Sequence, residues 1–397
     1  MNVLIVGADY YAQIGGKTTH IIMLKKGLEE CGHSVNVLFP RRNLLTKIII
    51  GGGGKILDLF GAGIIYRQFM IKTLFKAIIR NFLRHSIVDV INAEDIVAFF
   101  SIYELRKKPP IILTMHGELA QEMESAGHTK SAFEKKFFLN MEKKAYECAD
   151  YIVTVDTRLK RHIENLAPDA RGKLDVIQNF IDVDSFRVEI ESLDKEKIKK
   201  ELKIDFCKKV ILVPRRLVLK CGVIYAVRAA EILLHKFNRN DLFFVIVGDG
   251  PEKANLMSYI QKKNLQDMVW LVGSVEYQEM VKYYRIANVV LVPSINVKGY
   301  QEATSLSVLE AMAAKIPVIA SNLGGLAELI NNRVTGILVP EGSIEDIANN
   351  IIELLKHKDI KNKIVIAAFD YVFEKHSHKS AARKFIEIYK NGIKKNR

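Results

Sequence analysis

Short apolar runs alternate with longer amphipathic segments from one end of the sequence to the other. Each run has the length of a buried strand, and every connection is long enough to contain a helix, so parallel sheets are favoured. This order of segments predicts an α/β protein with doubly wound, Rossmann-like sheets. The runs that we interpret as strands are residues 2–7, 34–39, 87–93, 111–116, 151–156, 174–179, 210–214, 243–248, 269–273, 289–294, 317–321 and 337–342.

The predicted strands fall into two sets on either side of residues 187–208, a segment dense in charge that we interpret as a linker with a solvated helix. A chain of 397 residues is long enough for two domains with separate cores. We expect an N-terminal domain over residues 1–186 and a C-terminal domain over residues 209–374. Residues 375–397 contain an amphipathic helix whose apolar stripe must pack on a domain, and we expect it to complete the first one.

The composition is that of a soluble globular protein, with 49% hydrophobic and 26% charged residues. A formal charge of +14 attracts anionic partners, but no zinc-ligand spacing or RNA-binding signature accompanies it, so nucleic acid is not expected among them. The four cysteines are far apart and form no CxxC motif, which fits free thiols in a reducing compartment. The first residues do not resemble a signal peptide, and no apolar run has the length of a transmembrane helix. We therefore expect a cytoplasmic location.

A strand-to-helix segment at residues 289–314 is the sharpest candidate site. Ligands of doubly wound sheets bind beyond the carboxyl ends of the strands, where its loop lies. The backbone N–H groups at the start of the helix, near Thr304 or Ser305, can bind a phosphate. Glu310, one turn into the helix, could accept from a ribose, and Glu302, in the loop, from a sugar beyond a diphosphate. Taken singly, each carboxylate is as well explained as a surface charge.

The Glu302–Glu310 pair, followed by Ala311-Met312-Ala313, resembles the E-x7-E signature of the group-1 family of retaining GT-B glycosyltransferases. The segments PVIASNLGGLAELI, TGILV and VGDGP and the opening strand with Gly15-Gly16 are also similar to that family. The resemblance covers nearly the whole chain and is weakest over residues 40–85. It implies two Rossmann-like domains that face a central cleft, and transfer of a sugar from a nucleotide diphosphate.

The resemblance also implies roles for individual residues. Glu302 would contact the donor sugar and Glu310 the ribose, although Ala303 stands where the family usually has glycine. The implied catalytic residues are His116, Glu302, Arg216 and Lys220, and the implied donor-binding residues are Gly16, Gly248, Val275, Ala303, Thr304, Ser305, Leu306 and Glu310. No metal ligand or cofactor is implied. Glu118 is a weaker candidate for the acceptor.

The basic pair rests on similarity to the family's Arg-Leu…Lys…Gly pattern. An arginine and a lysine can stabilise the charge that develops on a departing diphosphate. Lys220 lies one residue nearer the arginine than is usual, and Cys221 occupies the more usual position, so Arg215 is a rival to Arg216.

Residues 41–85 place arginine and lysine at near-helical intervals among bulky apolar residues. Two interpretations are open. The segment lies on an anionic membrane surface, as a basic amphipathic helix can, or it packs its apolar face on the N-terminal domain. The first would make the protein peripheral on the inner face of a membrane.

These observations predict a hexosyltransferase-type enzyme that moves a sugar from a UDP- or GDP-sugar to a glycan, lipid-linked or small-molecule acceptor, with retention of configuration, as in polysaccharide biosynthesis. No carboxylate suits a covalent route, so front-face attack is preferred, with domain closure as part of the cycle. The alternatives are a sugar-nucleotide epimerase on the same fold and a non-catalytic binding subunit.

Overall fold

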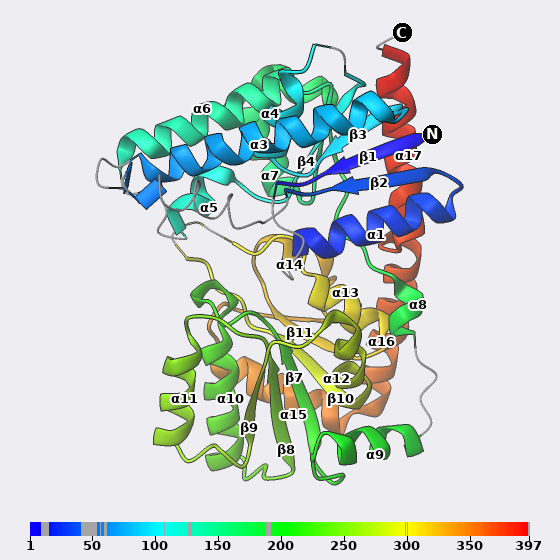
Figure 1. The fold of residues 1–397 in the computed structure, drawn as a ribbon. Coiled ribbons are helices and arrows are strands. Elements are labelled where there is room, and N and C mark those ends of the chain that lie inside the picture. Colours follow the sequence, from blue (N-terminus) through cyan, green and yellow to red (C-terminus); the bar gives the residue numbers. More distant parts are fainter. Residues whose placement is uncertain are drawn as a thin grey trace. The chain divides into compact units, whose positions relative to one another are not determined.

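The fold is described from a computed structural model (Figure 1). The structure describes residues 1–8, 16–40, 54–55, 57–58, 62–106, 108–125, 129, 131–187, 192–297, 299 and 301–395. The chain forms two compact units, residues Met1–Asn179 with His378–Arg397, and residues Phe180–Ser377. Each unit contains one six-stranded parallel sheet, so the prediction of two doubly wound domains is confirmed.

The sheet of the first unit has the strand order β2-β1-β3-β4-β5-β6. Apolar side chains make β3 and β4 wholly buried, as expected of strands covered on both faces. The strands are β1 (Asn2–Val6), β2 (Ser34–Leu38), β3 (Val90–Ala93), β4 (Ile111–Met115), β5 (Tyr151–Thr154) and β6 (Leu174–Val176). The helices are α1 (Gly16–Glu30), α3 (Gly63–His85), α4 (Ile96–Tyr103), α5 (Leu119–Ser125), α6 (Ala132–Cys148), α7 (Thr157–Leu166) and α17 (His378–Lys395).

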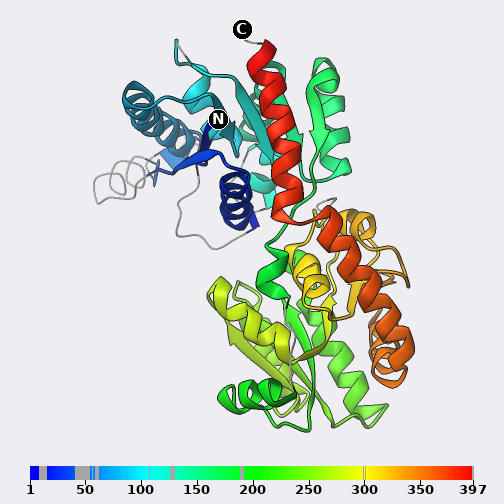
Figure 2. The ribbon, with the colours of Figure 1, turned by 90° about the vertical axis from the view of Figure 1, so that its right-hand side faces the viewer.

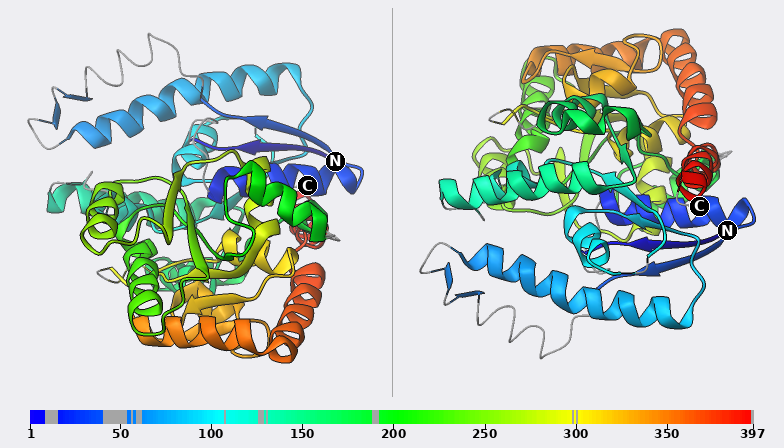
Figure 3. Two further views of the ribbon diagram at one scale, coloured as in Figure 1. Left: turned by 90° about the horizontal axis from the view of Figure 1, so that it is seen from below. Right: turned by 90° about the horizontal axis from the view of Figure 1, so that it is seen from above.

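The last helix, α17, belongs to the first unit, as expected, and runs beside α1 (Figures 2 and 3). Close packing requires Gly27 at the contact, because a Cβ there would lie 2.5 Å from the backbone oxygen of His378. The stripe that the sequence predicts on α17 is buried, with Phe385 and Tyr389 fully inaccessible. These two helices cover one face of the sheet, and α3, α4 and α6 lie over the other (Figure 1).

The sheet of the second unit has the order β12-β11-β10-β7-β8-β9. Its two faces are covered by separate clusters of apolar side chains, each held by its own helices. The strands are β7 (Lys209–Pro214), β8 (Leu242–Val247), β9 (Val269–Gly273), β10 (Ala287–Val292), β11 (Val318–Ser321) and β12 (Ile337–Val339). The helices are α8 (Val183–Phe186), α9 (Ser192–Glu201), α10 (Val223–His235), α11 (Lys253–Lys262), α12 (Met280–Ile286), α13 (Leu306–Ala313), α14 (Gly324–Leu329), α15 (Ile344–Lys356) and α16 (Lys358–Lys375).

The boundary between the units differs from the one expected at residues 187–208. The division falls after Asn179, and the described part of the expected linker belongs to the second unit. The physical reason is the burial of apolar side chains. Ile198 of α9 and Ile204 after it are buried in the second unit's core, with Phe186 of α8. A segment dense in charge can still contribute a few apolar side chains at helical spacing to a core.

Candidate functional site

Each sheet has one place where successive connections leave in opposite directions, and ligands of such sheets bind there. In the second unit that place is between β7 and β10, which are neighbours although three crossovers separate them. The loop after β7 contains Arg215, and the loop after β10 contains Ser294 and Glu302. The expected donor segment therefore lies at the switch point of the second sheet.

Arg215 holds these two loops together. Its Nη2 donates to Glu302 Oε2 over 2.7 Å and to Ser294 Oγ over 3.0 Å, and its Nη1 donates to Ser305 Oγ over 3.3 Å. The Arg215 side chain is only 7% exposed, so this ion pair is largely shielded from water. The guanidinium thus fixes the carboxylate of Glu302 and the residue before α13 in one arrangement.

Basic groups dominate the surroundings of Glu302. Burial alone would raise the pKa of its carboxyl, but Arg215, then Lys220, and finally Arg216 outweigh it and hold the pKa below its ordinary value. Burial lowers the pKa of Lys220, an effect that Glu302 opposes. Three cations around one carboxylate leave a positive excess at the switch point. Such an excess suits a diphosphate.

The start of α13 is buried and tied to the sheet. Thr304 and Ser305 are 5% and 2% exposed, and the Ser307 hydroxyl donates to the Pro214 carbonyl over 2.9 Å. Ser305 is the N-cap residue, and its side chain accepts no capping hydrogen bond from the helix. Backbone N–H groups in the first turn, from Leu306 on, are the kind of donor that an anion can use.

Two glycines allow the loops to approach this closely. A Cβ on Gly325 would lie 2.5 Å from the carbonyl carbon of Ala303, and the Gly325 N–H donates to the Glu302 carbonyl over 2.8 Å. Gly248 has φ +147°, and a Cβ there would lie 2.1 Å from the Arg215 carbonyl oxygen. The glycines of the two motifs NLGGLAELI and VGDGP therefore support the loops that contain Glu302 and Arg215.

Glu310 lies on the buried side of α13 and is 6% exposed. The Tyr284 hydroxyl donates to its Oε2 over 2.7 Å. Burial raises the pKa of Glu310 to about 7, against the opposing effect of hydrogen bonds from Tyr284 and Tyr277. The two glutamates of the signature thus differ in environment, because one faces cations and the other faces phenols.

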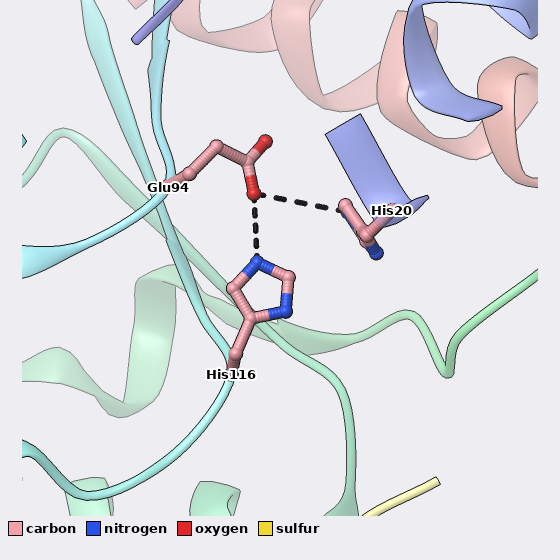
Figure 4. Close-up of side chains that lie close together, drawn as sticks. All are labelled: His20, Glu94 and His116. Atoms are coloured by element: carbon pink, nitrogen blue, oxygen red, sulfur yellow. Dashed lines mark hydrogen bonds and ion pairs between the residues drawn. The ribbon is translucent and has the colours of Figure 1, made fainter. Parts of the chain in front are cut away.

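The first unit presents a second group of polar residues at its own switch point, between β1 and β3. His116, directly after β4, lies with its Nε2 2.7 Å from Glu94 Oε2, directly after β3 (Figure 4). His20 of α1 completes the group, with its Nε2 3.9 Å from the same oxygen. Its Nδ1 lies 3.1 Å from Asn179 Oδ1.

Burial governs the ionisation of this group. It lowers the pKa of His20 to about 4 and raises that of Glu94 to about 7. His20, where it is protonated, and Lys17 act against burial at Glu94 without overcoming it. At neutral pH His20 is therefore uncharged.

Among the residues that the structure describes, these three are the group that could hold a metal ion. Their ligand atoms all lie within 4.8 Å of one another. Two imidazoles and a carboxylate are a donor set that divalent transition metals use. The short contact between His116 and Glu94, however, has the length of a direct hydrogen bond.

The structure brings most of the predicted site residues to the carboxyl ends of strands. In the second unit these are Arg216, Lys220, Gly248, Val275, Glu302, Ala303, Thr304, Ser305 and Leu306. In the first unit His116 lies at such an end, Gly16 is the first residue of α1, and Glu118 pairs with Arg158. Gly15 lies outside the described residues.

Sequence reasoning missed four residues that the structure places in these groups. They are Ser294, Tyr284, Glu94 and His20. The sequence offered a signal for two of them, because Ser294 ends an apolar strand and Glu94 follows one. The sequence also favoured Arg216 over Arg215 as the candidate residue. In the structure Arg215 makes the hydrogen bonds to Glu302, Ser294 and Ser305, and Arg216 is exposed.

Comparisons with known proteins identify the family and the fold of this chain. Residues 194–371 match the model of glycosyl transferases group 1, and residues 14–185 match that of glycosyltransferase family 4. An uncharacterised glycosyltransferase of Methanocaldococcus jannaschii is 26% identical over 396 residues, which is 98% of both chains. The amylovoran biosynthesis glycosyltransferase AmsK of Erwinia amylovora is 32% identical over 45% of this chain and 44% of its own.

The crystal structure of Anabaena HepE in complex with UDP-glucose superposes with a TM-score of 0.73 at 16% identity, covering 98% of this chain and 100% of that one. This likeness identifies the GT-B fold. Together with the family matches and the loops around Glu302, it defines a glycosyltransferase of the GT-B class. The chain belongs to the group 1 glycosyltransferases.

Proposed function

We propose that this enzyme transfers a sugar from a nucleotide diphosphate donor, a UDP- or GDP-sugar, to an acceptor hydroxyl with retention at the anomeric carbon. The observation that carries the proposal is the positive excess around Glu302 at the switch point of the second sheet. A diphosphate is the part of the donor that needs cations, and a carboxylate is a good acceptor for sugar hydroxyls. One site thus offers both.

The proposed step needs no covalent enzyme intermediate. The bond between the anomeric carbon and the diphosphate oxygen breaks, and its electron pair goes to the phosphate. The acceptor hydroxyl oxygen bonds to the same face of that carbon, and its proton passes to the departing phosphate. Arg216, Lys220 and the first N–H groups of α13 would stabilise the charge on the leaving group, so the proposal requires no metal.

His116 is proposed to contact the transferred sugar, and Glu310 the ribose. The names of similar proteins favour a nucleotide-sugar donor: HepE was crystallised with UDP-glucose, and AmsK acts in amylovoran biosynthesis. They make a glycan or lipid-linked acceptor in polysaccharide biosynthesis our first choice, with a small molecule as the other.

Membrane contact is a second, smaller proposal, which concerns α3. This helix contains five arginines and lysines and no acidic residue. Phe75 and Ile79 are fully buried on the first unit, so part of its apolar side packs there, while Phe69 is 56% exposed. None of the helices that the structure describes is long and apolar enough to cross a membrane. Flotation with anionic and neutral liposomes at low salt tests the proposal, and equal recovery with both would contradict it.

The decisive assay of the main proposal has two parts. A thermal-shift screen across UDP-, GDP- and ADP-sugars identifies the donor, and release of nucleotide from that donor is then measured with and without candidate acceptors. We expect stabilisation by one nucleotide class and acceptor-dependent release. Isomerised donor without acceptor dependence would indicate an epimerase. Absence of binding by every nucleotide sugar would leave only a non-catalytic subunit.

A further inference from the structure

Four side chains form a chain of hydrogen bonds that ends on His116. The Thr114 hydroxyl donates to Asn92 Oδ1 over 3.2 Å, and Asn92 Nδ2 donates to Glu94 Oε1 over 2.5 Å. The other carboxylate oxygen, Oε2, lies 2.7 Å from His116 Nε2. Thr114, Asn92 and Glu94 are at most 1% exposed, so water does not compete for these contacts. His116, at 16% exposed, is the one member that reaches the surface.

The chain has a fixed direction. The Glu94 carboxylate can only accept, so the Asn92 NH₂ group faces it, and the Asn92 oxygen accepts from the Thr114 hydroxyl. A carboxylate offers only lone pairs, and its second oxygen therefore accepts the proton of His116 Nε2. A neutral imidazole with that proton keeps a lone pair on Nδ1. Figure 4 shows Nδ1 on the side of the ring away from Glu94.

We propose that Glu94 is a positioning residue for His116, which it holds in the Nε2–H tautomer so that Nδ1 can accept a hydrogen bond from a hydroxyl of the transferred sugar. The inference rests on the proposed function for its substrate. The orientation of the ring and its tautomer rest on the hydrogen bonds alone.

Glu94→Gln tests the tautomer because Asn92 dictates how the new amide must lie. With Thr114 still donating to the Asn92 oxygen, the Asn92 NH₂ group pairs with the glutamine oxygen, so the glutamine turns its own NH₂ group toward His116. That ring nitrogen then becomes an acceptor, and the proton moves to Nδ1. We expect kcat to fall roughly 10- to 100-fold, as for partners that orient a functional histidine. The affinity for nucleotide should change less than about twofold, because the proposed contacts to the diphosphate and ribose, from Arg216, Lys220 and Glu310, lie in the other unit.

The double variant Asn92→Asp with Glu94→Gln is the matched control. An aspartate at residue 92 accepts from the glutamine NH₂ group, so the glutamine oxygen turns back toward His116. The pair keeps one carboxylate, as in the natural protein. We expect the double variant to regain at least half of the lost activity on a logarithmic scale. A purely structural role for Glu94 predicts that the two changes add their damage instead.

Nitrogen-15 chemical shifts of the His116 ring report which nitrogen carries the proton. The measurement should be made at pH 8, above the pKa of about 7 that burial gives Glu94. Among the described residues, the other ionisable groups that act on Glu94 are His20, Lys17, Asp95 and Tyr389, and all are unchanged in the variants. We expect Nε2–H in the natural protein and in the double variant, and Nδ1–H in Glu94→Gln.

Three results would overturn the inference. They are an unchanged tautomer in Glu94→Gln, full activity of that variant, and a stoichiometric metal ion bound by the group in place of the hydrogen bond. Failure of the natural protein to bind or turn over any nucleotide sugar would instead contradict the proposed function, and the tautomer measurement would still test Glu94 by itself.

Discussion

Glu302, whose side chain is 15% exposed, and Glu94, at 1%, are both carboxylates at the switch point of a parallel sheet, and their partners make them different. Arg215 and Lys220 outweigh the effect of burial and lower the pKa of Glu302. At Glu94 the partners are imidazoles and an amide, and burial prevails, so the pKa rises to about 7. The same side chain thus serves as a permanent anion in one unit and as a titratable hydrogen-bond acceptor in the other. The place of each glutamate in the fold brings it to a switch point, and the charges around it determine whether its carboxyl group is ionised at neutral pH.

Removing Arg215, the cation that pairs with Glu302, should have the largest effect on stability. Arg215→Met leaves Glu302, only 15% exposed, without its ion-pair partner, and we expect a loss of about 3 kcal/mol in the free energy of unfolding. Arg216→Met removes an exposed side chain and should change the stability by less than about 0.5 kcal/mol while slowing turnover. Urea denaturation of both variants measures the difference, and equal stability losses would show that Arg215 does not organise the site.

The loop that contains Glu302 depends on Gly325, and this dependence is the next largest expected effect. A Cβ at residue 325 would lie 2.5 Å from the Ala303 carbonyl carbon, in backbone that cannot move aside alone. Gly325→Ala should lower the free energy of unfolding by about 1–3 kcal/mol through overpacking. Gly172→Ala is the control, because nothing lies within 4 Å of its added Cβ. Thermal unfolding compares them, and equal midpoints would refute the close approach.

Glu310 is a buried glutamate whose neighbours are phenols, in contrast to the cations near Glu302 and the imidazoles near Glu94. If it binds the ribose, Glu310→Ala should weaken nucleotide binding roughly tenfold, the equivalent of about 1.4 kcal/mol. Tyr284→Phe removes only the hydroxyl that donates to Glu310 and is the control for a structural effect. Titration calorimetry with the donor nucleotide measures both. An unchanged dissociation constant in Glu310→Ala would remove Glu310 from the donor site.

The smallest expected effect is on the pH dependence of stability. The pKa of Glu94 is raised, so the native state binds the extra proton, and its contribution to stability falls as the pH rises from about 4.5 to about 7. Glu94→Gln should flatten that part of the profile. The pKa of Glu302 is lowered, so its contribution is present at neutral pH and is lost as the pH falls below about 4.5. Urea denaturation of Glu94→Gln between pH 5 and 8 tests the sign, and an unaltered slope would contradict it.

The sequence predicted the strands well, because apolar runs are continuous in the chain, and the Glu302–Glu310 pair is a local motif whose proposed role in donor binding stays a prediction. It did not separate Arg215 from Arg216, since adjacent residues at the end of a strand point to opposite sides and a shift of one residue reverses them. It missed the partnership of Glu94 and His116 because 22 positions separate them. Only the pairing of β3 with β4 brings those two residues together.

The linker shows a different limit. Its charge density predicted solvation correctly for most of the side chains that the structure describes there, but two isoleucines suffice to fix the segment to a core. Counting charge over a window hides such a pair, whereas the contacts of Ile198 and Ile204 with the second unit decide where the segment belongs.

We propose that the donor binds at the switch point of the second sheet, through the loops that the Arg215–Glu302 ion pair holds together. The test is titration calorimetry of the free donor nucleotide with the natural protein and with Glu302→Gln, paired with kcat of both for the preferred nucleotide sugar. Glu302→Gln should still bind free nucleotide within about threefold but turn over the donor roughly 10²–10³ times more slowly, as expected when one stabilising group is lost. Turnover equal to that of the natural protein would contradict the claim.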